Sequence, residues 1–129
     1  NACTDITGYG LIGHLKEICE SSSVTAIINA KDIPIIDGAS NYASNEENIP
    51  GGTKKNYDYF KSVVQYEATE KKINELQLYD AQTSGGLLIS VSKDKKDDLL
   101  NNLKKQKCLS YSAIGKIVDK KTSHLIQIK

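Results

Sequence analysis

Apolar residues recur along the chain at two spacings, one typical of helices and the other typical of strands. Residues 8–21 predict an amphipathic helix, because their apolar positions repeat at helical spacing and a run of serines follows. Those positions are Leu11, Leu15, Ile18 and Cys19. Residues 24–30 are rich in β-branched side chains and predict a strand, and residues 33–36 continue it as extended chain. A second helix with a polar face is expected over residues 37–48.

The middle of the chain is less regular. Residues 49–56 contain one proline and two glycines and predict a loop, because these residues favour turns. Residues 57–68 fit either a strand or irregular chain, and residues 69–79 predict a helix. Residues 80–86 are a second glycine-rich segment, which we expect to be a loop.

The last third of the chain predicts one helix and three strands. Residues 87–92 give the clearest strand, and residues 96–106 predict a helix with three leucines on one face. Residues 111–119 and 124–129 predict an antiparallel pair of strands joined by a lysine-rich turn at residues 120–123. Helices and strands interleave without a regular repeat, so we expect an α+β fold, with helices packed on a mixed β-sheet.

Composition is that of one globular domain over residues 1–129, with 39% hydrophobic and 26% charged residues. The net charge of +1 gives no general attraction to nucleic acid or to membranes. No apolar run approaches the roughly 18 residues of a membrane span. We therefore expect a cytoplasmic domain that binds neither nucleic acid nor membrane. The absence of methionine, even at position 1, indicates part of a longer protein.

Cysteine and histidine do not form a metal-binding pattern. Cys3, Cys19 and Cys108 are an odd number at wide spacings, which predicts reduced thiols rather than disulfides. Cys19 lies on the apolar stripe of the first helix and is expected in the core. His14 on that helix is more typical of a structural histidine, and with these cysteines it lacks zinc-site spacing. We expect no zinc.

Three segments pair glycine with threonine or serine: TDITGYG at 4–10, PGGTKKN at 50–56 and TSGG at 83–86. Glycine lets backbone amides converge on an anion, and hydroxyls add neutral donors. All 17 basic residues are lysine, so a phosphate would be held by amides, hydroxyls or a lysine such as Lys54. Each segment alone is more typical of a turn, but three together indicate a site. None matches a known nucleotide-binding loop, since the G-x-G-x-x-G at 8–13 follows no convincing strand.

Asp5 is the most informative carboxylate, and two roles remain open for it. It could be the N-cap of the first helix, a common use of aspartate. It could instead bind Mg²⁺, a hard ion that prefers carboxylate and phosphate oxygens. One carboxylate does not make a magnesium site, so further ligands would lie outside this chain.

Four motifs, TDITGYGLIGHL, IPGGTKKN, DAQTSGGLLISV and AIGKIV, occur in the order seen in selenophosphate synthetase and span nearly the whole chain. The chain resembles the C-terminal domain of that family, whose fold is shared with the aminoimidazole ribonucleotide synthetase superfamily. Two positions differ from the usual family pattern. Tyr9 replaces phenylalanine and keeps an aromatic ring, and Ala81 replaces proline and only loosens a turn.

The resemblance implies an enzyme that converts ATP, selenide and water into selenophosphate, AMP and phosphate, as a homodimer. In the family, the N-terminal domain of the same chain holds most of the nucleotide and the reactive cysteine or selenocysteine. We therefore expect no catalytic residue here, and a fragment that folds but is inactive alone. The family aspartate that binds Mg²⁺ corresponds to Asp5. Candidate phosphate contacts are Thr7, Gly8, Gly51, Gly52, Thr53, Thr83, Ser84, Gly85 and Gly86.

Two alternatives remain at this point. The chain could belong to a related ATP-dependent synthetase, such as aminoimidazole ribonucleotide synthetase or a hydrogenase-maturation enzyme. It could also come from an inactive paralogue that serves as a binding module. The residues upstream of Asn1 would distinguish an active enzyme from an inactive one.

Overall fold

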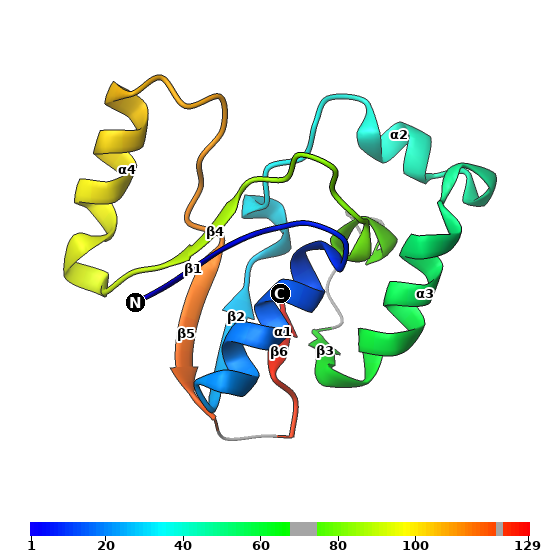
Figure 1. Cartoon of the computed structure of the whole chain (residues 1–129), viewed down its shortest axis with the longest axis horizontal. Coiled ribbons are helices and arrows are strands. Elements are labelled where there is room, and N and C mark those ends of the chain that lie inside the picture. The colour runs from blue at the N-terminus through cyan, green and yellow to red at the C-terminus, as the bar shows by residue number, and fades with distance from the viewer. Residues whose placement is uncertain (68–74, 121–122) are drawn as a thin grey trace.

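The computed structural model describes residues 1–67, 75–120 and 123–129. The strands are β1 (Ala2–Asp5), β2 (Val24–Ile28), β3 (Val64–Tyr66), β4 (Leu87–Ser90), β5 (Gly115–Asp119) and β6 (Ile126–Ile128). The α-helices are α1 (Gly10–Ser21), α2 (Ala39–Ala43), α3 (Gly51–Phe60) and α4 (Lys96–Lys105). Short 3₁₀ helices lie between them, including η4 (Glu75–Tyr79). The mixture of sheets and helices confirms the α+β fold class (Figure 1).

The strands form a four-stranded sheet in the order β3-β6-β2-β5 and a two-stranded sheet of β1 and β4. β6 runs parallel to both β2 and β3, whereas β5 runs antiparallel to β2. The predicted pairing of residues 111–119 with 124–129 is therefore wrong, because β2 lies between β5 and β6. A short connection favours a hairpin locally, but β2 has two edges and its own side chains are largely buried, so both strands pair with it. Residues 121–122 of the predicted turn lie outside the described residues.

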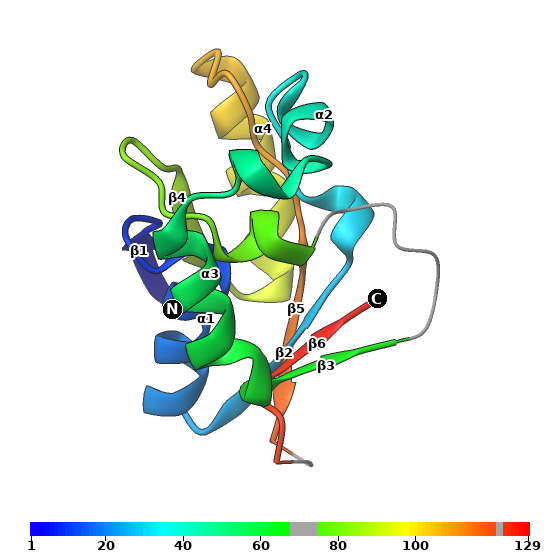
Figure 2. The same ribbon diagram turned by 90° about the vertical axis from the view of Figure 1, so that its right-hand side faces the viewer.

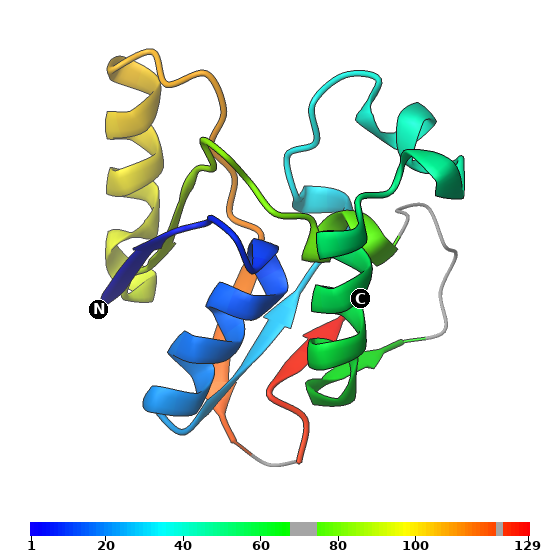
Figure 3. The same cartoon turned by 45° about the vertical axis from the view of Figure 1, so that its right-hand side comes forward.

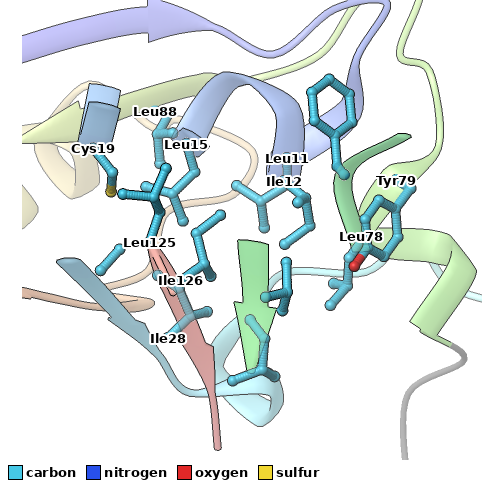
Figure 4. Packing of buried hydrophobic residues seen from close by; sticks show 14 residues of the cluster. Leu11, Ile12, Leu15, Cys19, Ile28, Leu78, Tyr79, Leu88, Leu125 and Ile126 are labelled. Carbon is cyan, nitrogen blue, oxygen red and sulfur yellow. The ribbon is translucent and has the colours of Figure 1, made fainter. Parts of the chain in front are cut away.

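The core lies between α1, the four-stranded sheet and η4. Figure 3 shows α1 and α3 side by side on one face of this sheet, and Figure 2 shows the same arrangement from another side. Helix α1 contributes Leu11, Ile12, Leu15 and Cys19 to the buried cluster, which includes Ile126 and Tyr79 (Figure 4). The predicted apolar stripe of the first helix and the buried position of Cys19 are confirmed.

Helix α3 contradicts the loop that the sequence predicted over residues 49–56. It begins at Gly51, directly after Pro50, and continues to Phe60. Proline is well tolerated at the start of a helix, because the first N–H groups have no partner within the helix. The burial of Thr53 and Phe60 against the domain offsets the low helix propensity of the two glycines.

The segments on either side of α3 also differ from their predictions. Of residues 37–48, only Ala39–Ala43 form an α-helix, and a 3₁₀ turn follows over Glu46–Asn48. Residues 33–36 form no strand in the described structure.

The ambiguous and helical segments after α3 have mixed outcomes. Residues 57–68 contain the end of α3 and the strand β3, and residue 68 lies outside the described residues. Of the helix predicted over 69–79, the structure describes residues 75–79, which form the 3₁₀ helix η4.

The predictions after residue 80 for the loop, the strand and the helix are confirmed. Residues 80–86 have no helix or strand, β4 spans Leu87–Ser90, and α4 spans Lys96–Lys105. All residues of α4 are described, and none of them is fully buried. Within residues 1–67, 75–120 and 123–129, no helix is both long and apolar enough to cross a membrane.

Candidate functional site

The first glycine-rich segment and the TSGG segment lie side by side. Just after β1, the Ile6 N–H donates to the Gly86 carbonyl at 2.9 Å. One residue later, the Thr7 carbonyl accepts from the Gln82 N–H at 3.0 Å and from the Gly10 N–H at 3.1 Å. The pairing of β1 with β4 continues this contact, and Figure 1 shows the two strands adjacent. The fold thus brings two of the three predicted segments together.

Two glycines are required by this close approach. Gly10 has a positive φ of +66°, and a Cβ atom there would lie 2.6 Å from the Tyr79 carbonyl carbon. A Cβ on Gly85 would overlap the Ile6 carbonyl oxygen. Because real side chains are excluded at both positions, these glycines allow the backbones to touch. Gly8 has no such neighbour and is exposed.

The third segment joins the site through side chains of α3. The Thr53 hydroxyl donates to the Asp80 carboxylate, and Thr53 is only 1% exposed. The Asn56 side-chain amide donates to the Gly8 carbonyl at 2.9 Å and to the Tyr79 carbonyl at 3.0 Å. Helix α3 is therefore bonded to the first segment through Gly8 and to Asp80, which precedes the TSGG segment, and the Thr53 hydroxyl already donates to Asp80.

His14 supports the first loop from the helix that follows it. Its Nε2 atom lies 3.1 Å from the Thr7 hydroxyl, and its Nδ1 atom lies 3.1 Å from a Glu17 carboxylate oxygen. Which ring nitrogen carries the proton decides the donor in each contact. Either way, His14 orients the Thr7 side chain, which fits the structural role expected for this histidine.

The candidate phosphate contacts differ in exposure. Thr7 and Gly85 are half-buried, and Thr53 is buried. The remaining candidates are exposed, and they are Gly8, Gly51, Gly52, Thr83, Ser84 and Gly86. Neither the segment at 50–56 nor the one at 83–86 lies inside the hydrophobic core, so both keep a surface that a ligand can reach.

Asp5 is the last residue of β1 and lies opposite Leu87 of β4 in the sheet register. It is exposed, and its carboxylate forms no hydrogen bond or ion pair with any residue that the structure describes. Helix α1 begins at Gly10, with Tyr9 at the N-cap position and no side-chain cap. The interpretation of Asp5 as the helix cap is therefore wrong, because a loop separates the strand end from the helix.

The chemistry of Asp5 fits a partial magnesium site. A free, exposed carboxylate is the ligand type that Mg²⁺ prefers. Across residues 1–67, 75–120 and 123–129, no group of three or more His, Cys, Asp or Glu side chains is placed to hold a metal ion. Among the described residues of the site, Asp5 is thus the carboxylate without a partner, because Asp80 accepts from Thr53 and Gln82, and a complete magnesium site would need further ligands.

Two lysines near the site, Lys16 and Lys55, line a cavity. A cavity of about 400 Å³ between α1 and α3 is lined by Tyr9, Lys16, Glu17, Lys55, Asn56, Tyr59 and Phe60. Lys16 pairs with Glu20 at 2.6 Å, and this hydrogen bond raises the lysine pKa. Lys54, a candidate phosphate contact, donates to the Glu46 carbonyl at 3.3 Å.

A tyrosine pair lies beneath the site. The Tyr66 and Tyr79 hydroxyls are 2.9 Å apart. Burial raises the pKa of Tyr79 to about 12, and burial together with the Tyr79 hydrogen bond raises the pKa of Tyr66 above its usual range. Both hydroxyls therefore stay neutral at physiological pH, and the pair serves as a polar contact within the core.

Sequence reasoning missed several residues of the site. The Asn56 and Asp80 side chains carry hydrogen bonds between segments, and Gln82 joins the first segment through its backbone N–H while its side chain donates to Asp80. All three fall inside the motifs PGGTKKN and DAQTSGG. Polar side chains close to paired glycines in the sequence were the available signal, but their partners are fixed only by tertiary structure.

Comparison with known proteins shows the family of this chain. The family model described as AIR synthase related protein, C-terminal domain, matches residues 1–127. The chain belongs to this family. Three family motifs, TDITGYG, PGGTKKN and DAQTSGG, are the segments that the fold brings together. The resemblance inferred from the sequence is thereby confirmed.

Similar proteins are named selenide, water dikinase. The chain is 42% identical over 120 residues to that of Caldanaerobacter subterraneus subsp. tengcongensis, covering 93% of this chain and 34% of that protein. It is 39% identical over 118 residues to that of Aliarcobacter butzleri, covering 92% of this chain and 34% of that protein. It is 38% identical over 128 residues to that of Aeromonas hydrophila, covering 99% of this chain and 36% of that protein. The chain thus spans about a third of the length of these curated relatives.

Proposed function

We propose that this chain is the C-terminal domain of a selenide, water dikinase, which uses ATP, selenide and water to make selenophosphate, AMP and phosphate. The identity of 42% to a relative of that name supports this proposal, as does the match of the family model to nearly the whole chain. The observation that carries it is the position of Asp5: an exposed carboxylate without a partner among the described residues, beside a loop held by two glycine-rich segments.

The proposed role of Asp5 is to bind Mg²⁺ together with carboxylates of another domain. The metal supplies charge neutralisation to the phosphates of ATP. Phosphoryl transfer asks the protein mainly for positioning and electrostatic stabilisation, which two domains can share. Of the two carboxylates described at this site, Asp80 accepts from Thr53 and Gln82, and Asp5 has no partner among the described residues, which is consistent with that division of work.

The proposed phosphate-binding surface consists of exposed or half-buried groups around the first loop. Thr7 and Gly8 supply it from the loop itself. Gly51 and Gly52 add the first N–H groups of α3, which have no partner within the helix. Thr83, Ser84, Gly85 and Gly86 would complete it. Thr53 leaves this set, because its hydroxyl donates to Asp80.

The proposed partners follow from the same incompleteness. We propose that residues 1–129 are one domain, that the N-terminal domain of the same chain supplies the remaining metal ligands and the reactive residue, and that the full-length protein is a homodimer. The fragment alone would then be inactive. Its relatives are about three times as long as the matched region, which is consistent with an additional domain.

The experiment that tests this function is product analysis of the full-length protein. Incubation with ATP, Mg²⁺ and selenide, followed by ³¹P NMR, is expected to show selenophosphate, AMP and phosphate in equal amounts. Omission of selenide is the control for unrelated ATP hydrolysis. Absence of selenophosphate would contradict the proposal and favour a related synthetase or an inactive binding module.

A further inference from the structure

One side chain of the segment at 50–56 bonds both to the first glycine-rich segment and to the last residue of η4. The Asn56 Nδ2 atom on α3 donates to the Gly8 carbonyl at 2.9 Å and to the Tyr79 carbonyl at 3.0 Å. A side-chain amide carries two N–H donors, so one NH₂ group satisfies both carbonyls. Asn56 is half-buried, and so these bonds are partly shielded from competing water.

The loop that Asn56 holds has no regular structure of its own. Between the end of β1 and the start of α1, its backbone is fixed by the Ile6 contact to Gly86, by the Gln82 contact to Thr7 and by the Asn56 contact to Gly8. The first two bonds come from the TSGG side of the loop. The Asn56 bond comes from α3 on the other side, so it limits movement in a direction that the first two leave open.

The position of the loop matters because Thr7 lies on it and Asp5, the last residue of β1, directly precedes it. Asp5 is three residues before Gly8, and Thr7 is adjacent to it. The Tyr79 carbonyl that shares the Asn56 amide belongs to the segment against which Gly10 packs. A shift of the Gly8 carbonyl would therefore move the backbone that carries the Asp5 and Thr7 side chains.

We infer that Asn56 is a positioning residue, which ties Gly8 to Tyr79 and thereby sets the geometry in which Asp5 and Thr7 meet a metal-bound polyphosphate. This inference rests on the proposed function for the identity of the ligand. It gives the PGGTKKN motif a role that the sequence did not suggest, because the Thr53 side chain donates to a carboxylate and the Asn56 side chain donates to two backbone carbonyls.

The test compares two asparagines in the full-length protein. Asn56→Ala removes the bond to Gly8 and to Tyr79, and Asn56→Asp keeps the size of the side chain but replaces the donor by a carboxylate. Asn48→Ala is the matched control, because the Asn48 amide also donates to a backbone carbonyl, that of Tyr42, at 3.0 Å. Two quantities are measured for each variant: amide hydrogen exchange and the affinity for Mn²⁺, used as the probe metal, in the presence of ATP.

The inference predicts a local effect for both Asn56 variants. Exchange of the Gly10 and Gln82 amides, which both bond to the Thr7 carbonyl, should accelerate at least tenfold, and the Mn²⁺ dissociation constant should rise about tenfold. The Asn48 variant should change neither quantity by more than twofold. Unchanged exchange at these amides would overturn the inference. Faster exchange with unchanged Mn²⁺ affinity would overturn it too, because loop position would then not govern the ligand.

Asp5→Asn separates this inference from the proposed function. Loss of Mn²⁺ affinity in Asp5→Asn, with no loss in either Asn56 variant, would overturn the positioning role alone. Unchanged affinity in Asp5→Asn would contradict the proposed metal ligand, whereas the exchange data would still decide whether Asn56 holds the loop. Global loss of structure is recognised by faster exchange in β2 and β6, and the nearly isosteric Asn56→Asp then provides the decisive comparison with Asn48→Ala.

Discussion

The hydroxyl of Thr53, in the first turn of α3, donates a hydrogen bond to the carboxylate of Asp80, 27 residues later in the chain. Asp80 also accepts from the Gln82 side chain, through both its backbone carbonyl and its carboxylate. The helix start and the glycine-rich loop at 80–86 are thus joined by one buried hydroxyl and one half-buried carboxylate. This contact explains why a segment with two glycines forms a helix here.

Replacement of Thr53 by valine is expected to destabilise the domain by about 1–3 kcal/mol. Valine fills nearly the same space but cannot donate, so the Asp80 carboxylate loses a bond that burial makes costly to replace. Thr53→Ser keeps the hydroxyl and should cost less than Thr53→Val. Urea unfolding of the 129-residue chain measures both, and equal stability of the two variants would show that the hydrogen bond contributes little.

Gly10→Ala is expected to destabilise the domain by more than about 2 kcal/mol. The fold holds residue 10 at a φ of +66°, a left-handed conformation that alanine rarely adopts. The new Cβ atom would also lie 2.6 Å from the Tyr79 carbonyl carbon. Gly8→Ala is the control, because no atom lies within 4 Å of a Cβ at Gly8 and its φ is not positive. Unfolding midpoints that shift equally in the two variants would contradict the close approach of α1 to residue 79.

Alkaline pH is expected to weaken the fold through Tyr66 and Tyr79. Their folded-state pKa values are raised, that of Tyr79 to about 12, by burial. Between about pH 10 and pH 12 the unfolded chain has lost these protons while the folded chain keeps them, so the free energy of unfolding falls as pH rises. Below pH 10 the contribution is fully present. Urea unfolding at pH 8 to 12 should show this decline.

Variants distinguish this decline from the titration of other groups. Tyr66→Phe removes one of the two buried ionisations and should make the decline above pH 10 shallower. Tyr42→Phe changes a tyrosine that is 73% exposed and should leave the slope as it is. An identical slope in both variants would exclude the buried pair as the cause.

Cys19 is expected to resist thiol reagents until the domain unfolds. Its side chain is fully buried, and burial raises its pKa, so little thiolate forms at pH 8. Cys3 and Cys108 are exposed free thiols. Titration of the 129-residue chain with a chromogenic disulfide should find two fast thiols in buffer and three in urea. A third fast thiol in buffer would contradict the packing of α1. Stoichiometric zinc in the preparation would contradict the expectation that the cysteines bind no zinc.

Local sequence patterns predicted those helices and strands whose intrinsic preference agrees with their place in the fold. The stripe of α1 and the leucines of α4 have helical spacing, and the β-branched residues of β2 favour a strand, so these elements could be recognised from the sequence. Pro50 and its two glycines favour a turn locally, but the burial of Thr53 and Phe60 outweighs that preference.

The partners within the sheet and the site could not be predicted in the same way. β5 and β6 are close in sequence, yet they lie on opposite edges of β2, and no local pattern encodes that choice of partner. The motifs named three segments that the fold brings into contact, and their role as a phosphate site stays a prediction. The bonds of Asn56 and Asp80 depend on contacts over more than twenty residues, which no local spacing encodes.

The central claim, that Asp5 is a shared magnesium ligand, is tested most directly by Asp5→Asn in the full-length protein. Asp5 is exposed and its carboxylate has no partner among the described residues, so thermal unfolding should match that of the unmodified protein and of the control Asp37→Asn, which changes another exposed carboxylate. Selenide-dependent AMP release should fall about a hundredfold or more in Asp5→Asn and stay unchanged in Asp37→Asn, since an amide does not neutralise Mg²⁺. AMP release within twofold of the unmodified rate in Asp5→Asn would contradict the account.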